Sequence, residues 1–123
     1  MIHVLATVTA KPGMRDRILE AFRANMPAVH AEEGCIEYGP AIDLDDAGPI
    51  QTKLGPDTFV VIEKWSSLDT LKAHAASPHM AAYGARTRDM IASRVIHPDS
   101  SRRVTQLDMG EKVPAWRRLR AVL

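Results

Sequence analysis

Phe59 to Tyr83, FVVIEKWSSLDTLKAHAASPHMAAY, is the stretch that decides the fold, because it holds a strand followed by two helix starts. Its first part, FVVIEKW, is rich in β-branched and aromatic residues and predicts a buried strand. Ser66 and Asp69 have the spacing of a capping box, so we expect a helix to begin there. Ser77 and Pro78 predict that this helix stops and a second one starts, since serine is a common N-cap and proline suits the first helical position.

The segments before this stretch predict a strand, a helix and a second strand. Residues 2–9 alternate between apolar and mixed positions, as a strand does. Residues 14–33 repeat apolar side chains every three or four positions, as an amphipathic helix does. We expect a second strand over Cys35 to Leu44. Because Gly39 and Pro40 interrupt it, this strand should lie at a sheet edge or contain a bulge.

A loop and a closing strand complete the pattern. Asp45 to Asp57 contains two Gly-Pro pairs and predicts a loop. Arg94 to His97 predicts a closing strand, and we expect Pro98 to end it. Both faces of the strand that begins at Phe59 are largely apolar. Helices are expected to cover one face, and a second copy of the chain is expected to cover the other, which predicts a homodimer that packs sheet against sheet.

The composition is that of one globular domain. The chain has 123 residues, of which 46% are hydrophobic, and its net charge is +1, so no overall field favours nucleic acid. It has neither the basic start of a signal peptide nor an apolar run as long as a membrane span, so we expect a cytoplasmic protein without a membrane partner. Residues 1–98 are expected to form the domain. Residues 99–123, with six basic and three acidic side chains, are expected to form a basic C-terminal arm.

The order of an aromatic strand, Glu-x-Trp and then A-H-x-x-S-x-H-x-x-x-Y, from Ala73 to Tyr83, resembles the antibiotic biosynthesis monooxygenase family. The resemblance covers residues 1–98. It implies an α+β ferredoxin-like fold, in which an antiparallel sheet has helices on one face and two chains form a dimeric α+β barrel. It also implies a monooxygenase that oxidises a small quinol or polyphenol with molecular oxygen and uses no metal or other cofactor.

Two alternatives to a quinol monooxygenase remain. The first is a non-catalytic module of the same fold that binds an aromatic ligand. The second, less favoured, is heme binding or degradation, for which relatives use a strand asparagine, a helix tryptophan and an axial histidine. This sequence has a single asparagine, Asn25, on the first expected helix, and it has His74 and Gly84 near the positions of that tryptophan and that histidine.

The histidines of the quoted stretch are the candidate catalytic residues. His74 or His79 is expected to act as the base, because histidine accepts a proton near neutral pH and a quinol must be ionised before oxygen takes its electrons. Trp65 and Tyr83 are expected to contact the substrate ring, and Arg86 is expected to hold the substrate anion. The further candidates for substrate binding are Glu63 and Tyr38.

Structural roles compete with these functional ones. Each histidine could simply be a satisfied polar side chain near the core, and Trp65 could be core alone. His74, His79 and Glu63 have the ligand types of a two-histidine, one-carboxylate iron site. On a continuous helix the two histidines would point about 140° apart, and only a break at Pro78 would bring them together. We therefore expect no metal.

Overall fold

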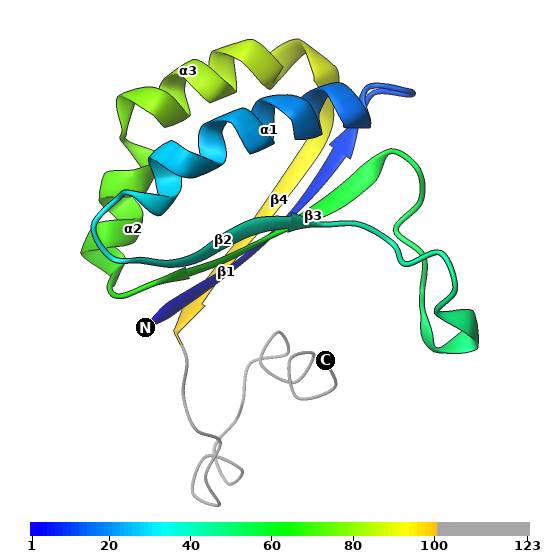
Figure 1. The fold of residues 1–123 in the computed structure, drawn as a ribbon, viewed down its shortest axis with the longest axis horizontal. Coiled ribbons are helices and arrows are strands. Elements are labelled where there is room, and N and C mark those ends of the chain that lie inside the picture. Colours follow the sequence, from blue (N-terminus) through cyan, green and yellow to red (C-terminus); the bar gives the residue numbers. More distant parts are fainter. Residues whose placement is uncertain (101–123) are drawn as a thin grey trace, which may run out of the picture.

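The computed structural model describes residues 1–100, which form a four-stranded antiparallel sheet and three helices (Figure 1). Short 3₁₀ turns precede β3 and β4, at Gly48–Ile50 and Arg88–Met90. The helices and strands follow in the order β1 (Ile2–Ala10), α1 (Arg15–His30), β2 (Cys35–Ala41), β3 (Thr58–Trp65), α2 (Leu68–Ala75), α3 (Pro78–Thr87) and β4 (Ile91–Ser100).

The strand order in the sheet is β2-β3-β1-β4, and every neighbouring pair is antiparallel. In Figure 1 the three helices lie on the same side of this sheet. This arrangement confirms the predicted α+β ferredoxin-like fold. None of the helices within residues 1–100 has the length and apolar character that a membrane span requires.

The inward face of the sheet forms the core together with α1. Phe22 of α1 stacks on Tyr38 of β2 with ring centroids 4.9 Å apart, and it meets the Phe59 ring edge-on at 6.2 Å. The alternation predicted for the strands is therefore confirmed, because the same side of each strand points inward. The buried apolar side chains of β1, α1 and β3 include Val4, Ala6, Val8, Ile18, Leu19, Phe22, Val29, Phe59, Val61 and Trp65.

The start of α2 differs by one position from its prediction. Ser67 is the N-cap, whereas Ser66 was expected, and its hydroxyl accepts a hydrogen bond from the Thr70 N–H at 3.2 Å. The Thr70 hydroxyl accepts in return from the Ser67 N–H at 3.2 Å, so a threonine closes the capping box where Asp69 was expected to close it. Ser66 instead donates its N–H to the Gly34 carbonyl at 2.8 Å.

The closing strand is longer than predicted. β4 continues to Ser100, so Pro98 does not end it. Pro98 lies opposite Val4 of β1, and β4 is an edge of the sheet, where a proline without an N–H is tolerated. The predicted basic C-terminal arm, 99–123, lies outside the described residues except for Asp99 and Ser100, which belong to β4.

β2 lies at the other edge of the sheet, as predicted, and the register of its pairing with β3 shifts between Cys35 and Glu37. It ends at Ala41, earlier than predicted, and residues 42–57 form a projecting loop (Figure 1). The Asp43 carboxylate accepts the N–H groups of Leu54 at 2.8 Å and Gly55 at 2.9 Å across the base of this loop.

Gly34 occupies a backbone position that should tolerate no side chain. Its φ is +80°, and an added Cβ would lie 2.5 Å from the Ser66 Oγ and 2.6 Å from the Thr70 Cγ2. Gly13 has a similar φ of +77° but has nothing within 4 Å of such a Cβ.

In urea unfolding, Gly13→Ala should lower the free energy of unfolding by about 1–2 kcal/mol, because of left-handed backbone strain. Gly34→Ala should lose about 3 kcal/mol or more, because the clash adds to the strain. Equal losses would contradict the clash.

Candidate active site

Two histidines and two carboxylates form a continuous chain of contacts, here called the His–Glu cluster (Glu32, Glu63, His74 and His79). The His74 Nε2 lies 3.5 Å from the Glu63 Oε1, and its Nδ1 lies 3.0 Å from the Glu32 Oε2. The His79 Nε2 contacts the Glu32 Oε1 and also lies 3.2 Å from the Ser77 Oγ. Glu32 therefore joins the two histidines, and Glu63 extends the chain toward the core.

The helix break places both histidines on Glu32. α2 ends at Ala75 and α3 begins at Pro78, as predicted. Between them, the Ser77 hydroxyl donates to the His74 carbonyl at 2.7 Å, which closes the last turn of α2 and does not cap α3. The predicted effect of the break is therefore seen, but the carboxylate shared by the two histidines is that of Glu32.

Aromatic rings enclose His74. His74 is only 4% exposed. The Trp65 ring centroid lies 4.5 Å from that of His74, and the Tyr38 ring centroid lies 5.4 Å from it. The Trp65 Nε1 donates to the Glu63 Oε1 at 3.1 Å, so the indole also holds the carboxylate. The fully buried Trp65 thus contacts cluster residues from the core side.

Burial affects the ionisation of the groups around the cluster. It raises the pKa of the Glu63 carboxyl, while the hydrogen bond from Trp65 and the nearby His74 act in the opposite direction. Burial also raises the pKa of Tyr38, and it raises the pKa of Tyr83 to about 12. Both tyrosines are therefore neutral hydroxyl groups at physiological pH.

The cluster needs more protons than two neutral imidazoles supply. A neutral imidazole has one N–H, yet His74 faces a carboxylate at each ring nitrogen. If its Nε2 donates to Glu63, its Nδ1 presents a lone pair to Glu32. That contact requires either a further proton or another positive charge. A positive charge close to Glu32, on a histidine or on a bound cation, would satisfy these contacts.

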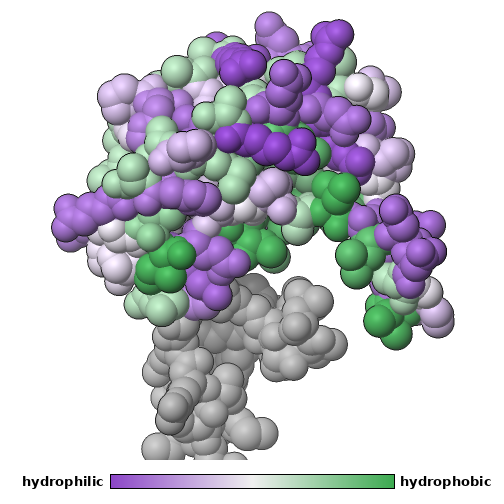
Figure 2. Space-filling model, in the orientation of Figure 1, coloured by the Kyte–Doolittle hydropathy of each residue, from purple (hydrophilic) through white to green (hydrophobic). Residues whose placement is uncertain are grey.

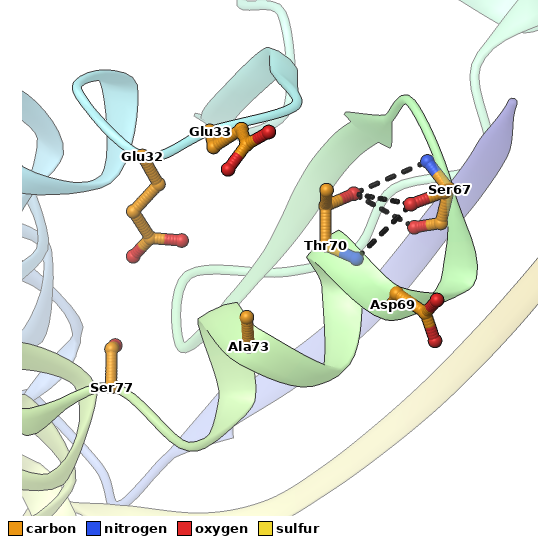
Figure 3. A pocket seen from close by; sticks show the side chains of 7 residues that line it. All are labelled: Glu32, Glu33, Ser67, Asp69, Thr70, Ala73 and Ser77. Atoms are coloured by element: carbon orange, nitrogen blue, oxygen red, sulfur yellow. Dashed lines mark hydrogen bonds between the residues drawn. The ribbon is translucent and has the colours of Figure 1, made fainter.

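A cavity of about 480 Å³ adjoins the cluster (Figure 3). Its lining residues come from the segment after α1, from α2 and from the residues that flank α2. They are Glu32, Glu33, Ser67, Asp69, Thr70, Ala73 and Ser77. In Figure 3 the Glu32 side chain reaches from its loop toward Ser77, while Ser67, Asp69 and Thr70 lie at the other end. The cluster therefore meets the cavity through Glu32. Ser77, whose hydroxyl lies next to the His79 ring, also lines the cavity.

The structure brings most of the predicted site residues together, and these are Tyr38, Glu63, Trp65, His74 and His79. The Tyr83 side chain forms no hydrogen bond with the His–Glu cluster within residues 1–98, and its ring meets the Phe22 ring edge-on at 6.0 Å. Arg86 is exposed on α3 and forms none of the hydrogen bonds or ion pairs found within residues 1–98.

Sequence reasoning missed Glu32. This residue follows α1 next to a second glutamate and belongs to no recognisable motif. Its partner His74 is 42 positions away along the chain, so only the fold brings the two together. The sequence offered one indirect signal, His74, because a histidine beside the apolar positions of a helix needs a polar partner.

Comparison with known proteins identifies related sequences over most of the chain. The family model described as "Antibiotic biosynthesis monooxygenase" matches residues 1–86. The chain is similar to the probable quinol monooxygenase YgiN of Escherichia coli K12, with 35% identity over 103 residues, which cover 80% of this chain and 98% of the relative.

Solved structures show the same fold at lower sequence identity. One described as an antibiotic biosynthesis monooxygenase has a TM-score of 0.67 and 22% identity, and the match covers 82% of this chain and 98% of the other. A structure from Mycobacterium tuberculosis has a TM-score of 0.68 and 20% identity, with 85% of this chain and 98% of the other covered. At such identities these structures support the fold alone.

Replacing Glu63 by glutamine should make stability less dependent on pH. Because burial raises the folded-state pKa of Glu63, the folded protein holds its proton more tightly than the unfolded chain does, and stability is lost as pH rises above the ordinary value of 4.5. Glu63→Gln keeps an acceptor for Trp65 but cannot ionise. Its free energy of unfolding, relative to that of the unchanged protein, should therefore increase with pH in urea titrations. A difference that falls with pH would show that His74 stabilises the carboxylate more than burial penalises it.

Proposed function

The chain belongs to the antibiotic biosynthesis monooxygenase family, and we propose that it oxidises a small quinol or polyphenol with molecular oxygen, without a cofactor. The relative named as a probable quinol monooxygenase supports this substrate class. The observation that carries the proposal is the His–Glu cluster at the end of the cavity, because it offers a histidine base that a carboxylate orients.

His79 is the residue we assign as the base. Its side chain is 28% exposed, whereas that of His74 is 5% exposed, so His79 is the histidine that a bound molecule can reach. A substrate hydroxyl at the cavity end would donate its proton to His79. The Glu32 carboxylate, in contact with the same ring, would stabilise the imidazolium that forms.

His74 is a positioning residue in this mechanism. It lies between Glu32 and Glu63, and the rings of Trp65 and Tyr38 fix its plane. Its contact with Glu32 keeps that carboxylate directed at His79. The buried aromatic side chains thus act on the reaction through the orientation of His74 and Glu32.

The ionised substrate supplies the electrons. A quinol and one O₂ give a hydroxyquinone and one water, so the four electrons that reduce O₂ all come from the ring, and one oxygen atom remains on it. No cofactor is required for this balance.

Tyr83 and Arg86 follow His79 along α3. We assign contact with the substrate ring to Tyr83 and attraction of the substrate anion to Arg86.

The outward face of the sheet supports a homodimer. Leu5 is 40% exposed and lies opposite Ile62, which is 38% exposed, and Val95 on β4 is 51% exposed. Leu5 and Ile62 are directly paired, and Val95 lies on the same face of the sheet, opposite Thr7. Exposed aliphatic side chains on three neighbouring strands suit burial against a second copy of the same sheet. We propose that two chains associate through these faces and form the barrel that the family resemblance implies.

His79→Ala should lower the rate of oxygen uptake by about 10²-fold or more, because general-base catalysis contributes about 10²–10⁴-fold. The assay is oxygen consumption with chemically reduced naphtho- and benzoquinols, on metal-stripped protein and corrected for autoxidation. Arg17→Ala, at an exposed position near the start of α1, is the control and should keep the rate. Uptake unchanged in His79→Ala would refute the assignment. Thermal stabilisation by the same compounds without uptake would indicate a non-catalytic binding module.

Leu5→Asp should dissociate the dimer, because it places a charge at the centre of an apolar interface. Light scattering at micromolar concentration would report the change in mass. Leu68→Asp is the matched control, since Leu68 is 50% exposed but lies at the start of α2, on the helical side. A monomeric unchanged protein, or equal effects of the two substitutions, would contradict the proposed interface.

A further inference from the structure

We propose that Glu32, His74 and His79 form a binding site for a divalent transition-metal ion, with Zn²⁺ as the probe. Each residue offers one ligand atom, and these atoms all lie within 4.8 Å of one another. Two imidazoles and one carboxylate are ligands that Zn²⁺ favours, and sites with three protein ligands keep a fourth position open.

The geometry of the cluster is the first argument. Three nitrogen-to-carboxylate contacts converge here, two of them on Glu32, and His74 as a neutral ring can donate in only one of its two contacts. A cation at the point where Glu32 meets both histidines would be bound by the lone pairs that otherwise face each other. It would also balance the charge of a carboxylate that is only 14% exposed.

The distances are close to those of a metal site. Metal bonds of 2.0–2.1 Å in a tetrahedron place ligand atoms roughly 3.3 Å apart. The His74 Nδ1 lies 3.1 Å and 3.0 Å from the two oxygens of Glu32, so this edge needs little adjustment. The His79 Nε2 lies closer to the Glu32 Oε1 than two ligand atoms of a tetrahedral site do. The His79 side chain must therefore move outward, and its partial exposure allows this movement.

The surroundings of His74 supply the support that metal ligands usually have. A metal-bound histidine commonly donates its other ring N–H to a carboxylate, which fixes its tautomer. Glu63 lies 3.5 Å from the His74 Nε2, and Trp65 donates to the same Glu63 oxygen at 3.1 Å. The His74 Nδ1 faces Glu32, where the ion would lie, while Glu63 faces the other ring nitrogen.

The open ligand position would face the cavity, because Glu32 and Ser77 both line it. A bound ion would also occupy the Nε2 lone pair of His79. If His79 is the base, as the proposed function requires, Zn²⁺ inhibits oxygen uptake. This consequence depends on the proposed function, whereas metal binding itself does not.

Isothermal titration calorimetry of Zn²⁺ into the untagged, chelator-treated full chain tests the site. We expect one ion per chain, and affinity at least tenfold weaker in His79→Ala and Glu32→Gln, both at partly exposed positions that spare the core. His97→Ala should bind as the unchanged protein does. Co²⁺ should give the visible absorption of a four-coordinate site, and this absorption should be lost in both site variants.

The results separate the two proposals. Absence of Zn²⁺ binding, or binding that neither site variant weakens, overturns the metal site whatever the oxygen-uptake assay gives. Binding of one ion that requires Glu32 and His79 supports the site even in a chain that oxidises no quinol. Circular dichroism of each variant verifies that the fold is intact before its affinity is compared.

Discussion

Proline at position 78 has no N–H with which to continue the hydrogen-bond ladder of a helix, so the chain must turn after Ala75. This turn changes the direction of the helix axis between His74 and His79. On one straight helix the two rings would point away from each other, but here they meet at a single carboxylate. The cluster, its contact with the cavity and its capacity for positive charge all follow from that turn.

The cluster is also tied to the core of the domain. Glu63 and Trp65 lie on the inward face of β3 beside Phe59 and Val61, so the sheet that defines the fold also holds one end of the contact chain. The other end depends on the segment after α1, where the Gly34 carbonyl accepts the N–H of Ser66. Packing of the sheet and placement of Glu32 are therefore coupled, because β3 holds Glu63 and Trp65 and the residue after it, Ser66, bonds to the segment that carries Glu32.

Local patterns predicted much of this structure, and contacts between distant residues account for the errors. Alternation and helical periodicity depend on near neighbours, so the strands and helices were found. The cap of α2 was misplaced because Ser66 and Ser67 are equivalent by sequence, and only Thr70 distinguishes them. Pro98 continues β4 because of its place at the sheet edge, and Glu32 was missed because its partners lie on other elements.

The projecting loop, residues 42–57, is tied to the body near its end, where the Asp57 carboxylate accepts the Gly13 N–H at 2.9 Å and the Gly55 carbonyl accepts from Arg15 at 3.3 Å. The Asp43 carboxylate bonds across its base, and Gln51 forms two hydrogen bonds with the backbone of Leu44, at 2.9 Å and 3.0 Å. Its apolar side chains, among them Ile50 at 91% exposure, face outward (Figure 2). The hydrogen bonds of the outer part, residues 42–54, stay within the loop, so its amides should exchange with solvent faster than those of the sheet. The domain thus carries a segment whose local stability depends mainly on its own hydrogen bonds.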